Sequence, residues 1–131
     1  MGKKPKKSLD EVVRRDGRYS LDAFPFLQEG LKRAVKQAYG EKADEDRPHH
    51  VTGRQLCLAL RDEALERWGI LARNVLTKWN IHATVDFGNM VYLLVDNALM
   101  DKTEEDCLDH FRDVYDFATA FEPGDLLDSE E

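Results

Sequence analysis

Long apolar runs are missing from this sequence of 131 residues. A membrane-spanning helix needs about 20 consecutive, mostly apolar residues, and the longest uninterrupted apolar run here is only a few residues. The basic residues at the start are not followed by the apolar segment that a secretory signal contains. We therefore expect a soluble, cytoplasmic protein that does not associate with a membrane.

Cysteine is also scarce, since only Cys57 and Cys107 occur. Each lies on the apolar face of a predicted helix, where a free thiol packs as a small apolar group. Two buried, unpaired thiols are typical of proteins in a reducing compartment. Cysteine usage therefore supports the cytoplasmic location.

Patterns typical of a catalytic or metal centre are missing as well. The four histidines, His49, His50, His82 and His110, have none of the spacings found in zinc motifs. The three serines do not form a Gly-x-Ser-x-Gly motif. We predict no metal, no cofactor and no enzymatic activity. Two less favoured interpretations are a zinc site that joins His110 and Cys107 to Cys57, and a metal-dependent enzyme built from His49, His50, His82 and acidic residues.

Asp86-Phe87-Gly88 has the letters of the magnesium-binding triplet of protein kinases. The glycine-rich loop, the strand lysine and the catalytic loop that act with this triplet in kinases do not occur in the sequence. We interpret Asp86 instead as a negative charge that stabilises the N-terminus of a helix.

Charge is distributed unevenly along the chain, whose net charge is −7. Residues 1–18 contain seven basic and three acidic side chains and so carry +4, which leaves −11 on the other 113 residues. An acidic body repels phosphate backbones, so specific binding to DNA is not expected. Weak phosphate contacts are expected only from Lys3, Lys4, Lys6 and Lys7, although such a stretch is more often a solubilising tail.

Apolar residues recur at spacings of three and four along most of the chain, which is typical of amphipathic helices. Ser8 with Glu11, and Thr52 with Gln55, have the spacing of capping boxes at helix starts. Thr103 with Asp106 has the same spacing and starts the last helix. The helices predicted from these signals cover residues 8–15, 22–39, 52–68, 70–79, 84–100 and 103–115.

The same spacing predicts which side of each helix faces the core. In helix 22–39 the inward residues are Phe24, Leu27, Leu31, Val35 and Ala38, and Gly30 lowers helix propensity by about 1 kcal/mol relative to alanine. In helix 70–79 they include Ile70 and Leu71, and Asn80 takes the left-handed closing position. In the last helix they are Cys107, Leu108, Phe111, Val114 and Tyr115. Gly88, near the start of helix 84–100, allows another helix to make a close contact there.

The fold class that follows is all-α. We expect a compact orthogonal or antiparallel bundle of about five main helices, preceded by a short N-terminal helix. One helical domain should cover residues 8–121. Residues 1–7 are expected to form a disordered basic tail, and residues 122–131 a disordered acidic tail.

Helices 70–79 and 84–100, with the short turn between them, also have the outline of a helix-turn-helix motif. A recognition helix needs side chains that donate hydrogen bonds to bases and phosphates. The second of these helices contains Asp86 and Asp96 but no lysine or arginine. Reading of the major groove is therefore a less favoured interpretation.

Protein binding is the favoured role for the exposed surface. Arg54, Leu58, Arg61 and Leu65 share one face of helix 52–68 beside its inward face. Aromatic residues are more numerous than a small bundle needs, and those left exposed beside arginine would suit an interaction hot spot. The predicted surface consists of Arg54, Leu58, Arg61, Leu65, Phe117 and Phe121.

Several short motifs lie between His49 and Phe121. They are His50–Gly53, the Trp79-x-Ile81 pair, Thr84-x-Asp86-Phe87-Gly88, Lys102–Asp106 and Val114–Phe117. Through these motifs the stretch resembles a family of small bacterial proteins of unknown function, found mainly in Planctomycetes, Verrucomicrobia and related lineages. Residues 19–40 fit this family loosely. The resemblance implies a soluble bacterial protein but no activity, cofactor or catalytic residue.

The sequence therefore predicts a non-enzymatic module that binds an unknown protein partner or a second copy of itself. A nucleic-acid-associated protein, using the lysine-rich start together with Lys32, Arg33 and Lys36, is the second hypothesis. The identity of the partner, the pathway and any role of the four histidines do not follow from the sequence.

Overall fold

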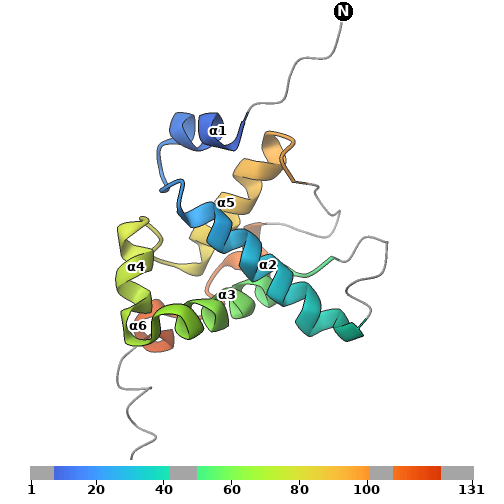
Figure 1. Cartoon of the computed structure of the whole chain (residues 1–131), viewed down its shortest axis with the longest axis vertical. Helices are drawn as coiled ribbons and strands as arrows, with labels where there is room; N and C mark the ends of the chain where they lie inside the picture. The colour runs from blue at the N-terminus through green and yellow to red at the C-terminus, as the bar shows by residue number, and fades with distance from the viewer. Residues whose placement is uncertain (1–7, 42–49, 101–107, 122–131) are drawn as a thin grey trace, which may run out of the picture.

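The computed structural model describes residues 8–41, 50–100 and 108–121, and within these ranges all regular structure is helical (Figure 1). The all-α prediction is confirmed, with five of the six predicted helices in their expected places. The α-helices are α1 (Leu9–Asp16), α2 (Ala23–Tyr39), α3 (Gly53–Trp68), α4 (Ala72–Lys78), α5 (Thr84–Asp96) and α6 (Phe117–Ala120), with 3-10 turns η2 (Gly69–Leu71) and η3 (Leu108–Phe111).

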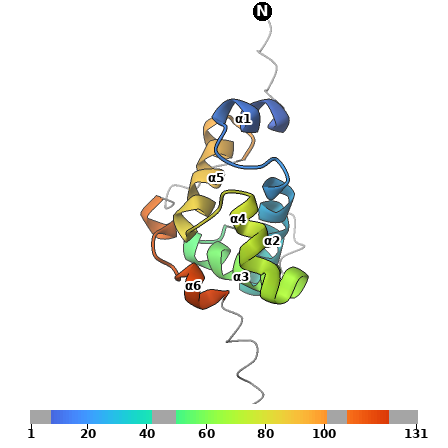
Figure 2. The same cartoon turned by 90° about the vertical axis from the view of Figure 1, so that its left-hand side faces the viewer.

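The core lies where α2, α3 and α5 meet. Helix α2 crosses α3, α4 turns steeply away from the end of α3, and α1 packs beside α5 (Figure 1). Figure 2 places α1 and α6 at opposite ends of the molecule. The largest fully buried side chains include Phe24, Leu60, Phe87 and Leu94, which come from these three central helices. None of the described helices is both long and apolar enough to cross a bilayer.

Helix starts follow the predicted capping signals closely. Ser8 accepts a hydrogen bond from the Glu11 amide at 3.1 Å, and Glu11 accepts one from the Ser8 amide at the same distance. Thr52 and Gln55 form the matching pair at 3.0 and 2.7 Å. These reciprocal bonds satisfy amides that have no partner inside the helix. The proposed start at Thr103 lies outside the described residues.

Helix α2 buries Phe24 and Leu27 as predicted, but its C-terminal half turns other residues to the core than predicted. Ala34 is buried, whereas Val35 is half-buried and Ala38 is exposed. The reason is Gly30, which lies against α3: a Cβ at this position would be 2.2 Å from Leu60 Cδ2. Gly30 is therefore a contact residue that lets the two helix axes approach, rather than only a weak point of the helix.

The last predicted helix does not form over the described residues 108–116. The chain makes the short turn η3 there and then folds back into α6, with Phe111 buried. This turn packs onto two glycines, because a Cβ on Gly53 or Gly88 would lie 3.0 or 2.7 Å from the Phe111 ring. The predicted close approach at Gly88 is confirmed, although its partner is a turn and not a helix.

Helix α5 ends at Asp96, four residues earlier than predicted. Ala98 adopts a left-handed conformation with φ 60°. The Leu99 amide donates to the Leu94 carbonyl at 2.8 Å, and the Ala98 amide donates to the Val95 carbonyl at 3.1 Å. This is the Schellman pattern of hydrogen bonds, in which glycine usually occupies the left-handed position. Alanine does not indicate a left-handed helix end in a sequence. The apolar spacing therefore predicted a helix longer than the one that ends at Asp96.

Replacing Ala98 with glycine is therefore expected to stabilise the protein by about 1 kcal/mol, because an L-residue in this conformation is strained by roughly that amount. Chemical denaturation with urea measures the change. Ala120→Gly is the matched control, because Ala120 ends helix α6 without a left-handed φ, and it should be neutral or destabilising. Equal effects of the two substitutions would contradict the explanation.

Candidate interaction surface

The most exposed large apolar side chains lie at the turn between α3 and α4. Ile70 is 51% exposed and Leu71 is 56% exposed. The prediction that both face inward is wrong, because η2 separates the two helices and α4 begins only at Ala72. Ala72 and Leu76, one turn apart, are the buried residues of α4. Ile70 and Leu71 consequently point to the outside.

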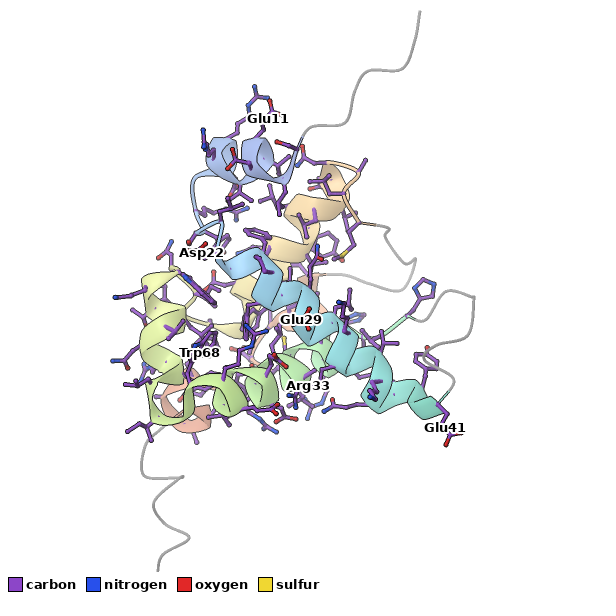
Figure 3. All side chains as sticks on the ribbon, in the orientation of Figure 1. Glu11, Asp22, Glu29, Arg33, Glu41 and Trp68 are labelled. Carbon is purple, nitrogen blue, oxygen red and sulfur yellow. The ribbon has the colours of Figure 1, made fainter. Side chains whose placement is uncertain are left out.

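Three aromatic rings support this turn from inside. The ring centroids of Trp68 and Trp79 lie 5.4 Å apart in an edge-to-face arrangement, and each lies within 6 Å of the Phe26 ring. The Arg67 guanidinium lies over Phe26 and Trp68 at 5.7 and 5.8 Å from their centroids. Figure 3 shows Trp68 at the end of α3, beside α4. Such rings hold the exposed turn on a rigid base.

From the end of α3 through α4, the charged side chains are all positive. Residues 67–85 contain Arg67, Arg73 and Lys78 but no aspartate or glutamate, although the whole chain carries −7. Arg73 and Lys78 are both exposed on α4, whereas Ala72 and Leu76 are buried. We call Trp68–Leu71 together with Arg73, Lys78 and Trp79 the α3–α4 corner. It combines exposed apolar groups with basic groups.

The surface predicted from the sequence is less suitable. Arg54 is exposed, whereas Leu58, Arg61 and Leu65 are half-buried. Leu65 packs against the core, and Arg61 pairs with Asp62 at 3.2 Å. These four residues do share one side of α3, but the apolar members are largely covered.

Phe117 and Phe121 are core residues, so including them in an exposed surface was a wrong prediction. They are 3% and 1% exposed. Phe117 lies 6.0 Å from the Phe87 ring and 5.1 Å from the Phe121 ring. The fold-back of α6 over the core produces this burial, and sequence spacing could not reveal it.

A polar cluster joins the α1–α2 linker to the start of α5. The Tyr19 hydroxyl donates to Asp86 at 2.6 Å, and Asn89 donates to the same hydroxyl at 3.1 Å. Burial and the bond to Asp86 raise the pKa of Tyr19 to about 12. Asp86 also accepts from the His82 and Ala83 amides at 2.8 and 3.1 Å, which is the stabilising role predicted for it. All of these hydrogen bonds hold the α1–α2 linker and the start of α5 in place.

Nucleophile and metal candidates do not come together in the described ranges. Cys57 is fully buried, and burial raises its pKa to about 12, so the thiol stays protonated and unreactive. His50, His82 and His110 are exposed. No group of three His, Cys, Asp or Glu side chains suited to a metal ion occurs among the described residues. His49, Cys107 and the four lysines Lys3, Lys4, Lys6 and Lys7 lie outside those residues.

A shallow groove between α2 and α3 carries a second concentration of charge (Figure 3). Arg33 of α2 bonds to Glu63 at 2.9 Å and pairs also with Glu66, while Arg67 bonds to Glu63 at 2.7 Å. Glu63 is 14% exposed. Burial alone would raise the pKa of Glu63, but the bonds from Arg67 and Arg33 outweigh it and hold the pKa below its ordinary value. These charges neutralise one another, so the charged residues of the groove serve to join α2 to α3.

The Glu63 contacts predict a dependence of stability on pH. Because the pKa of Glu63 is lower in the folded than in the unfolded state, its stabilising effect is complete above the unfolded-state pKa. It is lost as the pH falls through the folded-state pKa. Glu63→Gln should therefore lower the free energy of unfolding at neutral pH, with a smaller difference at acidic pH, in urea titrations. Glu29→Gln is the control, since its exposed pair with Lys32 contributes little. A constant Glu63→Gln effect from neutral to acidic pH would contradict this.

Helices α4 and α5 do not resemble a working helix-turn-helix in their exposure. Six residues of α5 are buried, from Thr84 to Leu94, so this helix belongs to the core. It has no basic residue with which to contact phosphate. Its position argues against insertion into a DNA groove.

Comparison with known proteins finds no matching family model, no similar curated protein and no similar solved structure.

Proposed function

We propose that this protein is a non-enzymatic module that binds another protein through the α3–α4 corner. The observation that carries the proposal is the exposure of Ile70 and Leu71 on a rigid aromatic base. Aliphatic groups that stay in water at about half of their area gain free energy when a partner covers them. Neighbouring aromatic rings and arginine are the residue types enriched in binding hot spots.

The charges of the corner indicate the chemistry of the partner. Arg73 and Lys78 would face carboxylates, so the partner surface should combine aliphatic side chains with acidic ones. Such charges mainly raise the association rate and select among partners. A cytoplasmic location, expected from the cysteine usage, and a bacterial source, implied by the family resemblance, belong to the same proposal.

Affinity capture from a lysate of the source organism tests this function. The bait is the full chain, and the comparison is the variant Ile70→Ser/Leu71→Ser, which removes the apolar groups without touching the core. Leu21→Ser is the matched control, because Leu21 is 40% exposed and belongs to the α1–α2 linker, outside the residues that define the corner. We expect a protein captured by wild type and by Leu21→Ser that is lost with Ile70→Ser/Leu71→Ser, with and without nuclease.

Two outcomes would contradict the proposal. Equal capture by Ile70→Ser/Leu71→Ser would show that the corner does not bind the partner. Loss of capture after nuclease treatment would show that nucleic acid bridges the two proteins, and it would favour the second hypothesis of phosphate contacts by basic side chains.

A further inference from the structure

The α3–α4 corner has a matching segment within the same chain. Residues 122–131 read Glu-Pro-Gly-Asp-Leu-Leu-Asp-Ser-Glu-Glu. This segment contains two adjacent leucines, Leu126 and Leu127, between five acidic residues. The corner presents two adjacent aliphatic residues beside positive charges. The segment therefore combines the aliphatic and acidic side chains that we propose for a partner of the corner. This inference rests on the proposed function.

The position of the segment allows it to reach the corner. It follows Phe121, the residue directly after α6. Helix α6 and the turn between α3 and α4 lie at the same end of the molecule in both views (Figures 1 and 2). Leu126 follows Phe121 by five residues, which span up to about 17 Å when extended. The pair Pro123-Gly124 favours a turn directly after α6.

Charge adds to this match. The segment contributes −5 of the chain's net −7, and the corner contributes +2 through Arg73 and Lys78. A tethered segment also has a high effective concentration, on the order of millimolar. A contact too weak to form between separate molecules is therefore populated within one chain.

We propose that residues 122–131 bind in cis to the α3–α4 corner. Leu126 and Leu127 cover Ile70 and Leu71, and the acidic side chains lie beside Arg73 and Lys78. The segment occupies the same surface as the protein partner and competes with it. A partner must displace the segment, so the segment sets the threshold for binding.

The two tryptophans of the chain report directly on this contact. Trp68 and Trp79 are the only tryptophans, and both belong to the corner. Acrylamide quenching of their fluorescence measures their exposure in the full-length protein. The variants are Leu126→Ser/Leu127→Ser, Ile70→Ser/Leu71→Ser and the combination of all four substitutions. Circular dichroism verifies that each variant keeps the helical fold.

We expect Leu126→Ser/Leu127→Ser to raise the quenching constant and to shift the NMR signals of the Ile70 and Leu71 amides. In Ile70→Ser/Leu71→Ser, the further change of both leucines should have no additional effect, because the contact is already lost. Asp125→Asn/Asp128→Asn should raise quenching less, and added salt should reduce the difference from wild type. Leu21→Ser, as a control, should leave quenching unchanged.

The proposal is wrong if Leu126→Ser/Leu127→Ser changes neither quenching nor the amide signals. It is also wrong if the difference from wild type disappears on dilution, because the segment would then come from a second copy. A negative result in the quenching and NMR experiments does not affect the capture experiment. The proposed function is therefore tested separately. If the proposed function and the cis contact are both correct, Leu126→Ser/Leu127→Ser should capture more partner than wild type.

Discussion

Replacing Leu94 with alanine is expected to lower the free energy of unfolding by about 2–5 kcal/mol, the range for truncation of a buried leucine. Leu94 is 1% exposed on α5, and its carbonyl also accepts the bond that closes this helix. Truncation removes apolar contacts and leaves a cavity that the buried Met90 and Val91, one turn away on α5, cannot fill without moving. Urea denaturation at neutral pH measures the change.

Leu21→Ala is the matched control for this experiment. Leu21 is 40% exposed, so its truncation should change stability by no more than about 0.5 kcal/mol. A similar loss for both leucines would mean that the face of α5 that carries Leu94 does not form the centre of the core.

Replacing Gly30 with alanine should also destabilise the protein, although helix propensity alone would favour alanine by about 1 kcal/mol. The new Cβ would be 2.2 Å from Leu60 Cδ2 and 2.7 Å from Leu60 Cγ. Leu60 is fully buried and cannot move aside freely. Overfilling a packed core costs about 1–3 kcal/mol. After the gain of about 1 kcal/mol from helix propensity, we expect a net loss of up to about 2 kcal/mol.

A second background separates this contact from other effects of the substitution. In Leu60→Ala, the obstacle is gone, and Gly30→Ala should become neutral or stabilising through helix propensity. The double-mutant cycle then gives a coupling between the two positions. Stabilisation by Gly30→Ala in the wild-type background would show that α2 and α3 are free to separate.

Helix starts and one helix end followed from short-range signals. The Ser8–Glu11 and Thr52–Gln55 pairs act within one turn of the helix, so three residues of sequence suffice to recognise them. Asn80 takes a left-handed conformation where the sequence placed a helix end. The buried residues Phe87, Met90 and Leu94 of α5 recur at spacings of three and four, a period that can be read from the sequence alone.

The candidate surface could not be predicted in this way. Ile70 and Leu71 continue the apolar pattern of a helix, and no glycine or proline separates them from Ala72. Whether they face inward depends on how many residues the 3-10 turn uses before α4 begins. That number is decided by the position of α4 against the rest of the core, which local spacing does not contain.

The sequence by itself determined the helical class, the starts of α1 and α3, and the identity of most core residues on α5. Tertiary structure alone decided that α2 turns Gly30 toward Leu60, that Phe111 closes onto Gly53 and Gly88, and that α5 stops at a left-handed Ala98. It also placed Ile70 and Leu71 outside and Phe117 and Phe121 inside. The physical reason is range: capping and periodicity act between residues a few positions apart, whereas close packing joins residues such as Gly53 and Phe111 that only the complete fold brings into contact.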